Sequence, residues 1–283
     1  IPVLSWQNVF FGDPMYRPFL VSLEEQVESL EKGKFDKYSQ YVVVRQMNKL
    51  MKTSSRSEAE AFAKRCAEVL TAHKIRVYMF SSLRPTPVLS FSILHLNCIA
   101  GINITASHNP AEYNGYKASW EDGAQLPPHH ADAIAKELEK IDIFTGVKAM
   151  PFDEAKAAGR IELMGEETDN AFMENVMAMV NDRACVAKVA DDFHVVYTPF
   201  HGCGWKLVPQ ALRDLGVKHL HCVPEQMVLD GSFPTVESPN PENPEGFYLA
   251  IALADQVGAN FIIGTDPDSD RVGILVSGTD GRF

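Results

Sequence analysis

Short apolar, β-branched runs alternate with segments of helical periodicity along most of this chain. Between residues 57 and 105 the order is helix, strand, helix, strand, and a similar order recurs between 193 and 276. Such alternation predicts mostly parallel strands connected by helices that pack on the sheet. The expected fold is therefore α/β, with mixed, mainly parallel sheets sandwiched by helices.

The periodicity also divides the chain into two units. A charged stretch at 181–192 separates them, so we expect two tandem domains, over 1–185 and 186–283. Residues 1–56 show no motif that assigns them to an element. In the first unit the expected helices are 57–70, 87–95, 129–141 and 168–180, and the expected strands are 75–80 and 98–105. In the second, the expected strands are 193–197, 218–223, 260–264 and 271–276, and the expected helices are 204–216 and 246–257.

Composition narrows the partners that the chain can take. The 283 residues carry a formal net charge of −11, which argues against nucleic acid and anionic membranes, since both favour basic surfaces. No apolar run approaches the roughly 20 residues of a membrane span, and the first residues lack a signal-peptide pattern. The five cysteines are odd in number and lack CxxC spacing, which indicates free thiols in a reducing compartment. We expect a soluble, cytoplasmic protein that acts on a small molecule, with its oligomeric state left open.

Two loops that follow predicted strands carry the chemistry. The first, Thr-Ala-Ser-His-Asn-Pro at 105–110, turns at Asn109 because the residue before proline is disfavoured in the helical region. It places Ser107 and His108 at the carboxyl end of a strand, where open α/β sheets bind ligands. A hydrolase nucleophile elbow needs glycine two residues on either side of the serine, which this loop lacks. Ser107 could instead carry a phosphate, and a polar turn capping a helix is the alternative.

The second loop, Gly-Thr-Asp-Pro-Asp-Ser-Asp-Arg at 264–271, also follows a strand. Residues two apart in an extended segment point the same way, so Asp266, Asp268 and Asp270 can direct three carboxylates to one cation. Mg²⁺ favours carboxylates shared with a phosphate oxygen. A Ca²⁺-binding EF-hand is excluded because the loop lacks the required glycine at its sixth position and glutamate at its twelfth. An acidic, solvated turn without a cation is the remaining alternative.

The residues around these loops resemble a known family, the α-D-phosphohexomutases. The segment 105–117 resembles their phosphoserine loop, 266–271 their metal loop, and Thr-Pro-Phe-His-Gly-Cys-Gly at 198–204 their second-domain glycine turn. Leu-Arg-Pro-Thr-Pro at 83–87 and Trp-Glu-Asp-Gly-Ala-Gln at 120–125 are similar to the phosphoglucomutase and phosphopentomutase branch. The resemblance implies the first two of four domains of such an enzyme, a phosphoserine-bearing domain followed by a metal-binding domain.

The resemblance also implies a mechanism. A Mg²⁺-dependent isomerase of this family moves a phosphoryl group between C1 and C6 of glucose phosphate, or C1 and C5 of a pentose phosphate. The reaction passes through a phosphoserine at Ser107 and a bisphosphate intermediate, and a sugar 1,6-bisphosphate is the activator. The Ser107 phosphate and the three aspartates would hold the Mg²⁺. Lys117 matches the acid–base residue, Arg56 an arginine that orients the phosphoryl group, and His108 and Arg271 would shape the site.

Other parts of the family pattern have no counterpart in this sequence. The element expected near the amino end is reduced to Phe-Gly-Asp-Pro at 11–14, and the sugar-binding and phosphate-binding loops of the third and fourth domains do not follow the metal loop. The segments 165–169 and 277–281 resemble those loops only superficially. We therefore expect this chain by itself to be a poor or inactive mutase. The alternative is a truncated, non-catalytic module that binds metal or sugar phosphate, and the sequence does not choose between glucose, mannose, ribose and deoxyribose phosphates.

Overall fold

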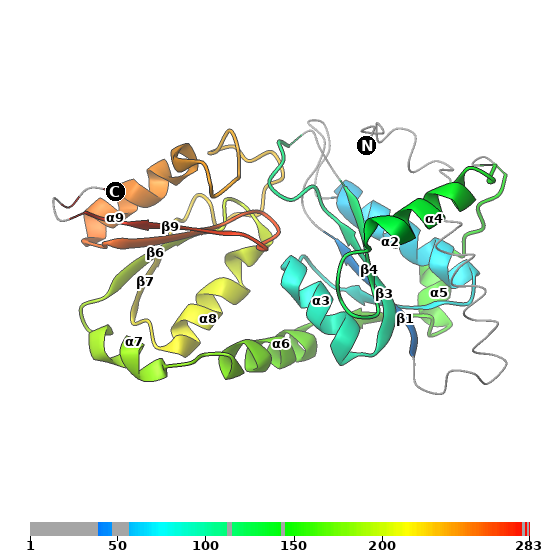
Figure 1. The fold of residues 1–283 in the computed structure, drawn as a ribbon, viewed down its shortest axis with the longest axis horizontal. Helices are drawn as coiled ribbons and strands as arrows, with labels where there is room; N and C mark the ends of the chain where they lie inside the picture. Colours follow the sequence, from blue (N-terminus) through cyan, green and yellow to red (C-terminus); the bar gives the residue numbers. More distant parts are fainter. Residues whose placement is uncertain (1–38, 47–56, 112–114, 143–144, 279–280, 282) are drawn as a thin grey trace.

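The computed structural model describes residues 39–46, 57–111, 115–142, 145–278, 281 and 283. In these residues two β-sheets lie side by side, each with helices packed against it (Figure 1). The strand order is β4-β3-β1-β2-β5 in the first sheet and β7-β6-β8-β9 in the second. Neighbouring strands are parallel except for the pairs β3–β4 and β8–β9. The predicted α/β fold, with mixed, mainly parallel sheets sandwiched by helices, is confirmed.

The first sheet is built around a strand that the sequence did not identify. Its central strand β1 pairs in parallel with both β2 and β3, and it lies within the segment that showed no motif. The run Tyr-Val-Val-Val at 41–44 is the signal, because a continuous β-branched run is typical of a strand inside a parallel sheet. The elements of this part are β1 (Ser39–Gln46), α2 (Ser57–Ala72), β2 (Arg76–Phe80), α3 (Thr86–His95), β3 (Cys98–Ile104), β4 (Tyr116–Trp120), α4 (Pro128–Leu138), α5 (Phe152–Ala157), β5 (Ile161–Met164) and α6 (Glu166–Ala178).

The second sheet repeats the connectivity of the first. In both, a strand, a helix, a second strand and a second helix lead to a third strand, which is followed by a loop and an antiparallel edge strand. Strands β6, β7, β8 and β9 thus correspond to β1, β2, β3 and β4. The elements of this part are α7 (Arg183–Val189), β6 (His194–Thr198), the 3₁₀ turn η3 (Cys203–Trp205), α8 (Leu207–Leu215), β7 (His219–Cys222), the 3₁₀ turn η4 (Pro244–Phe247), α9 (Tyr248–Val257), β8 (Phe261–Thr265) and β9 (Val272–Val276).

Alternation along the strands separates two apolar layers. On β2, Val77 and Met79 pack in one core with α2, whereas Phe80 packs in another with α3, as expected when successive side chains point to opposite faces. The second of these cores also contains Met173 of α6 and Leu207 of α8. Because α8 covers the second sheet (Figure 1), this apolar cluster joins the two halves of the molecule.

The expected elements from 57 onward agree with the structure to within a few residues, with two differences. The stretch at 181–192, expected as a charged separator, contains α7, whose first turn is capped by Asp182; its carboxylate accepts hydrogen bonds from the amides of Ala184 and Cys185. The domain boundary expected between residues 185 and 186 falls inside this helix and remains a prediction. Four other elements (β4, α5, β5 and the 3₁₀ turn η4) were not foreseen. None of the described helices is long and apolar enough to cross a membrane.

Candidate functional site

The loop that follows β3 presents Ser107 between the two sheets. Ser107 adopts φ 54°, a left-handed conformation that is uncommon for residues other than glycine. The turn is held by two hydrogen bonds: the Ser107 amide donates to Thr105 Oγ1 at 2.9 Å, and the Thr105 amide donates to the Gly115 carbonyl at 2.8 Å. A β-carbon at Gly115 would overlap the Thr105 carbonyl oxygen, so this approach requires glycine. The Ser107 side chain is largely buried, and its Oγ lies 3.1 Å from His108 Nδ1.

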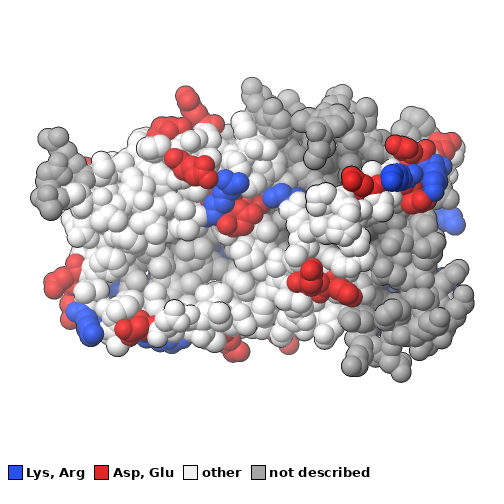
Figure 2. All heavy atoms as spheres, viewed as in Figure 1, with Lys and Arg blue, Asp and Glu red and all other residues white. Residues whose placement is uncertain are grey.

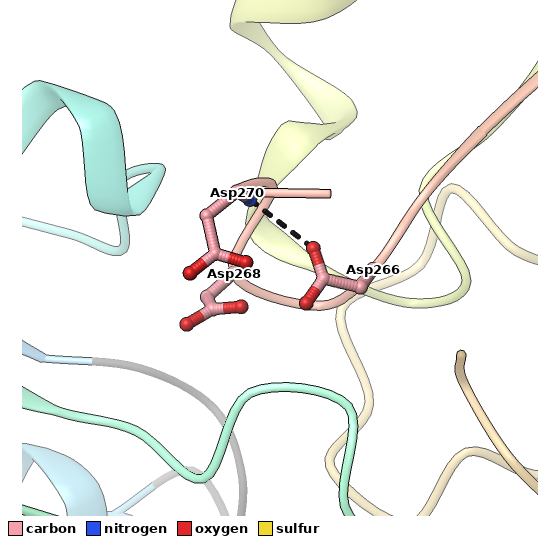
Figure 3. Close-up of side chains that lie close together, drawn as sticks. All are labelled: Asp266, Asp268 and Asp270. Carbon is pink, nitrogen blue, oxygen red and sulfur yellow. Dashed lines mark hydrogen bonds between the residues drawn. The ribbon is translucent and has the colours of Figure 1, made fainter. Parts of the chain in front are cut away.

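The loop that follows β8 directs three carboxylates toward one space. Ligand atoms of Asp266, Asp268 and Asp270 lie within 4.8 Å of one another (Figure 3). The chain curls around Asp266, whose Oδ1 accepts hydrogen bonds from the amides of Asp270 at 3.1 Å and Arg271 at 3.0 Å. Asp266 and Asp268 are fully buried. The three carboxylates converge as expected, but they do so through a turn and not through an extended segment, since Ser269, between Asp268 and Asp270, adopts φ 51°.

The glycine turn before α8 supports the aspartate loop from the side. The Cys203 amide donates to the Pro267 carbonyl at 2.8 Å, and a β-carbon at Gly202 would overlap the Pro267 backbone. Beneath the loop, the buried Tyr197 hydroxyl is 2.8 Å from Thr265 Oγ1. Backbone contacts thus fix the position of Pro267, and they therefore also restrict the positions of Asp266 and Asp268 on either side of it.

The two loops meet although they belong to different sheets. Ser107 Oγ donates a hydrogen bond to Asp266 Oδ2 at 3.2 Å. Asp268 Oδ2 accepts from Thr86 Oγ1 at 3.0 Å and from Thr105 Oγ1 at 3.1 Å. The Thr86 amide also donates to the Asp268 carbonyl at 2.8 Å. The loops that follow β3 and β8 therefore meet at one place, as the family resemblance implied.

The electrostatics of the aspartate loop favour a bound cation. Burial, and then the charge of Asp268, raise the pKa of Asp266 to about 8. Burial and Asp268 also raise the pKa of Asp270, and this rise is opposed by the positive charges of Lys117 and Arg271. Crowded, buried carboxylates hold protons unless a cation replaces them. Hard oxygen ligands in this number suit Mg²⁺ completed by a phosphate oxygen or water, so the donor set fits that ion.

Positive charge near the site is local. Lys117, on the edge strand β4, places Nζ 3.9 Å from Asp268 Oδ2 with its side chain 29 % exposed. On the face drawn in Figure 2, basic side chains of the described residues occur in small groups beside acidic ones. Because the chain as a whole carries a net charge of −11, attraction of a small anionic ligand to this site would depend on Lys117 and on a cation bound by the three carboxylates.

The structure brings together most of the residues that the sequence singled out. Ser107, His108, Lys117 and the three aspartates surround one space between the sheets. Arg271 contributes its backbone amide to Asp266, while its side chain forms a partly exposed ion pair with Glu242 at 3.1 Å. Arg56 lies outside the described residues. The roles expected for these side chains remain predictions.

Sequence reasoning missed the residues that hold Asp268 from the first sheet. Thr86 begins α3, and its hydroxyl also accepts a hydrogen bond from Asn103 Nδ2 at 3.1 Å. The signal lay in the segment 83–87, which was noted for its resemblance but given no function. Only the packing of α3 against β3 and the aspartate loop brings Thr86 within reach, because Thr86 and Asp268 are 182 residues apart in sequence.

Comparisons with known proteins agree with this architecture. Residues 54–143 match the family model described as phosphoglucomutase/phosphomannomutase, alpha/beta/alpha domain I. Residues 170–279 match the model for alpha/beta/alpha domain II of the same family. The first match contains the Ser107 loop and the second contains the aspartate loop, so each half of the site lies in a separately recognised domain.

Individual relatives cover most of this chain. It is 32% identical over 231 residues to a protein of Haemophilus influenzae named "Probable phosphomannomutase", a match that spans 81% of this chain and 45% of the relative. It is 34% identical over 222 residues to a phosphoglucomutase of Staphylococcus epidermidis, spanning 78% and 40%. A solved structure of a putative phosphomannomutase from Thermus thermophilus shares the fold, with a TM-score of 0.71 at 24% identity over 94% of this chain and 52% of that one. The chain thus spans less than half the length of the two curated relatives.

Proposed function

The chain belongs to the phosphoglucomutase/phosphomannomutase family, and on that premise we propose that it carries the phosphoserine and metal site of a Mg²⁺-dependent phosphosugar mutase. The proposed reaction moves a phosphoryl group between C1 and C6 of glucose phosphate, or between C1 and C5 of a pentose phosphate. The observation that carries the proposal is the hydrogen bond of 3.2 Å from Ser107 Oγ to Asp266 Oδ2. This contact supports the proposal because a phosphate on Ser107 would lie beside the three converging carboxylates and could share a cation with them.

The proposed cycle begins with a phosphate on Ser107. A sugar hydroxyl forms a bond to phosphorus as the bond between phosphorus and Ser107 Oγ breaks, which gives a sugar bisphosphate. The hydroxyl proton passes to Lys117, and Ser107 Oγ regains a proton from His108 Nδ1, which lies 3.1 Å away. The bisphosphate then returns its other phosphoryl group to Ser107 by the reverse steps. A sugar 1,6-bisphosphate thus serves as intermediate and as activator.

The side chains of the aspartate loop supply binding and orientation. Asp266, Asp268 and Asp270 would hold Mg²⁺, which when bound neutralises charge on the phosphoryl oxygens. Thr86 and Thr105 fix the Asp268 carboxylate by hydrogen bonds to Oδ2. Because Thr86 begins α3 and Thr105 directly follows β3, these donors connect the aspartate loop to the part of the molecule that carries Ser107. Orienting reactants in this way accounts for much of the catalysis of phosphoryl transfer.

The proposal includes a cytoplasmic location. Its support is that all five cysteines are free thiols, which persist in a reducing compartment.

The first experiment asks whether Ser107 accepts a phosphate. The 283-residue chain is incubated with glucose 1,6-bisphosphate and Mg²⁺, and phosphopeptides are quantified by mass spectrometry. We expect one phosphate on the peptide that contains Ser107, dependent on Mg²⁺. Labelling should vanish in Ser107→Ala and persist in Ser90→Ala, a matched change in α3 outside the site.

A coupled assay then tests turnover with glucose 1-phosphate, mannose 1-phosphate and ribose 1-phosphate. We expect any turnover to depend on Ser107. If Mg²⁺ binds but neither hexose nor pentose bisphosphates label Ser107, the mutase proposal is wrong. The non-catalytic metal- and sugar-phosphate-binding module would then replace it.

A further inference from the structure

The carboxylate of Asp169, in the first turn of α6, is buried and forms ion pairs with two basic side chains from different parts of the molecule. Its side chain is 3% exposed, and its Oδ1 accepts a hydrogen bond of 2.5 Å from Arg84 Nε. Its other oxygen, Oδ2, accepts one of 3.0 Å from Lys206 Nζ. Arg84 follows β2 in the first sheet, and Lys206 precedes α8 of the second. A buried carboxylate is tolerated when, as here, both of its oxygens accept hydrogen bonds from cationic side chains.

Arg84 is connected to the aspartate loop through the next two residues of the chain, Pro85 and Thr86. Arg84 is itself buried, and Pro85 connects it to Thr86, whose amide and hydroxyl both bond to Asp268. Proline restricts the backbone between them, because its ring fixes φ. The position of Arg84 therefore limits where Thr86 can present its two donors.

The Lys206 side leads to the opposite flank of the same loop. Lys206 directly follows η3, the turn whose Cys203 amide bonds to the Pro267 carbonyl and whose neighbour Gly202 packs on Pro267. Pro267 stands between Asp266 and Asp268. Asp169 thus connects, through one carboxylate, the segment that holds Asp268 from the first sheet and the turn that holds Pro267 from the second.

We infer that Asp169 is a positioning residue that sets the distance between Ser107 and the aspartate loop. It acts through Arg84 and Lys206 and does not contact the reacting atoms. The inference rests on the proposed function, since phosphoryl transfer from Ser107 requires that distance to be maintained. The segment 165–169 thereby gains a role that its superficial likeness to a sugar-recognition loop did not indicate.

The Thr86 amide is a direct probe of this arrangement. The first amides of a helix have no partner within the helix, so the protection of Thr86 against hydrogen exchange depends on its bond to the Asp268 carbonyl. Two other amides each report on one sheet. The Val77 amide donates to the Arg160 carbonyl in the first sheet region, and the Val223 amide donates to the Tyr197 carbonyl in the second. Comparing the three separates opening between the sheets from unfolding of either one.

The test is hydrogen exchange, followed by NMR, in Asp169→Asn and in Asp191→Asn. Asp191 pairs with Lys218 at 2.6 Å on the exposed surface, so it matches the substitution without touching the interface. We expect Thr86 to exchange at least about tenfold faster in Asp169→Asn, with Val77 and Val223 unchanged, and no change in Asp191→Asn. If Asp169→Asn fails to fold, Lys206→Met removes one cation and should produce a smaller effect with the same selectivity.

Unchanged exchange at Thr86, or equal acceleration at all three amides, would overturn the inference. The initial rate of Ser107 labelling by glucose 1,6-bisphosphate is then measured in the same variants, and Asp169→Asn is expected to lower it at least about tenfold. A normal labelling rate in Asp169→Asn also contradicts the positioning role. Absence of labelling in the unmodified chain would instead count against the proposed function, while the exchange result at Thr86 would still decide whether Asp169 couples the sheets.

Discussion

The Ser107 loop and the aspartate loop occupy the same place in two sheets of the same connectivity. Each connects the third strand of its sheet to an antiparallel edge strand, β3 to β4 and β8 to β9. Each also passes through a serine in the left-handed conformation, Ser107 at φ 54° and Ser269 at φ 51°. A shared backbone arrangement thus places two different chemistries opposite one another.

The two loops differ in which parts of the molecule hold them in place. The Ser107 loop carries a neutral hydroxyl and is held by local hydrogen bonds to Thr105 and across to Gly115. The aspartate loop concentrates buried negative charge, which raises the pKa of Asp266 to about 8. Its carboxylates need donors from the other sheet, and its backbone needs the glycine turn. The comparison indicates that the backbone of the Ser107 loop is held within its own half of the molecule, whereas the aspartate loop is held by residues of both halves.

Substitutions in the two loops should affect Mg²⁺ binding and the labelling of Ser107 differently. Asp268→Asn should lower Mg²⁺ affinity at least about a hundredfold, because it removes a fully buried ligand, and should abolish labelling of Ser107. Ser107→Ala should abolish labelling yet bind Mg²⁺ within a few-fold of the unmodified chain. Isothermal titration with Mg²⁺ and the phosphopeptide measurement provide both values. Equal Mg²⁺ affinity in Asp268→Asn and the unmodified chain would show that the cation binds elsewhere.

Substitution of the glycine that supports each loop should lower the stability of the protein but should affect Mg²⁺ binding to different extents. Gly202→Ala and Gly115→Ala each force a β-carbon against backbone atoms, and each should lower the free energy of unfolding by about 1–3 kcal/mol. Gly202→Ala should weaken Mg²⁺ binding more than Gly115→Ala, because Gly202 contacts Pro267 within the aspartate loop, whereas Gly115 contacts Thr105, which donates one hydrogen bond to Asp268. Urea denaturation and titration with Mg²⁺ measure the two effects. Loss of Mg²⁺ affinity in Gly115→Ala alone would reverse the assignment of supports.

The smallest effect concerns pH. Because the folded, metal-free chain raises the pKa of Asp266 to about 8 from its ordinary value of 3.8, it retains a proton there at neutral pH that the unfolded chain has lost. This contribution to stability is complete below the unfolded pKa and is lost as pH rises through about 8. Mg²⁺ must displace the proton, so its affinity should increase with pH by up to about tenfold per unit and level off above pH 8.

Titrations in buffers of different ionisation enthalpy, at about pH 6.5 and about pH 8.5, measure the released protons. The Ser107→Ala variant should show the same pH dependence as the unmodified chain, since the effect belongs to the aspartate loop. An Mg²⁺ affinity that is constant between these pH values would contradict the raised pKa of Asp266.

Local sequence patterns predicted the class of the fold and most of the side chains that meet between the two sheets. Strand and helix periodicity are local properties, and so are the spacing of the three aspartates and the turn at Ser107. They could be recognised because each depends on residues within one element or loop. The central strand β1 was missed in a segment without motifs, although its Tyr-Val-Val-Val run carried a local signal.

Which residues hold the two loops together depends on contacts between segments that are far apart in the sequence. Thr86 and Asp268 are 182 residues apart in the chain, and Arg84 and Asp169 are 85 apart. Neither pair has a sequence pattern, because a hydrogen bond of this kind depends on how α3, α6 and the second sheet pack as layers. From the sequence alone, an aspartate in the first turn of a helix is explained by its favourable interaction with the helix dipole. Burial between Arg84 and Lys206 makes Asp169 a link between domains, and packing alone creates that burial.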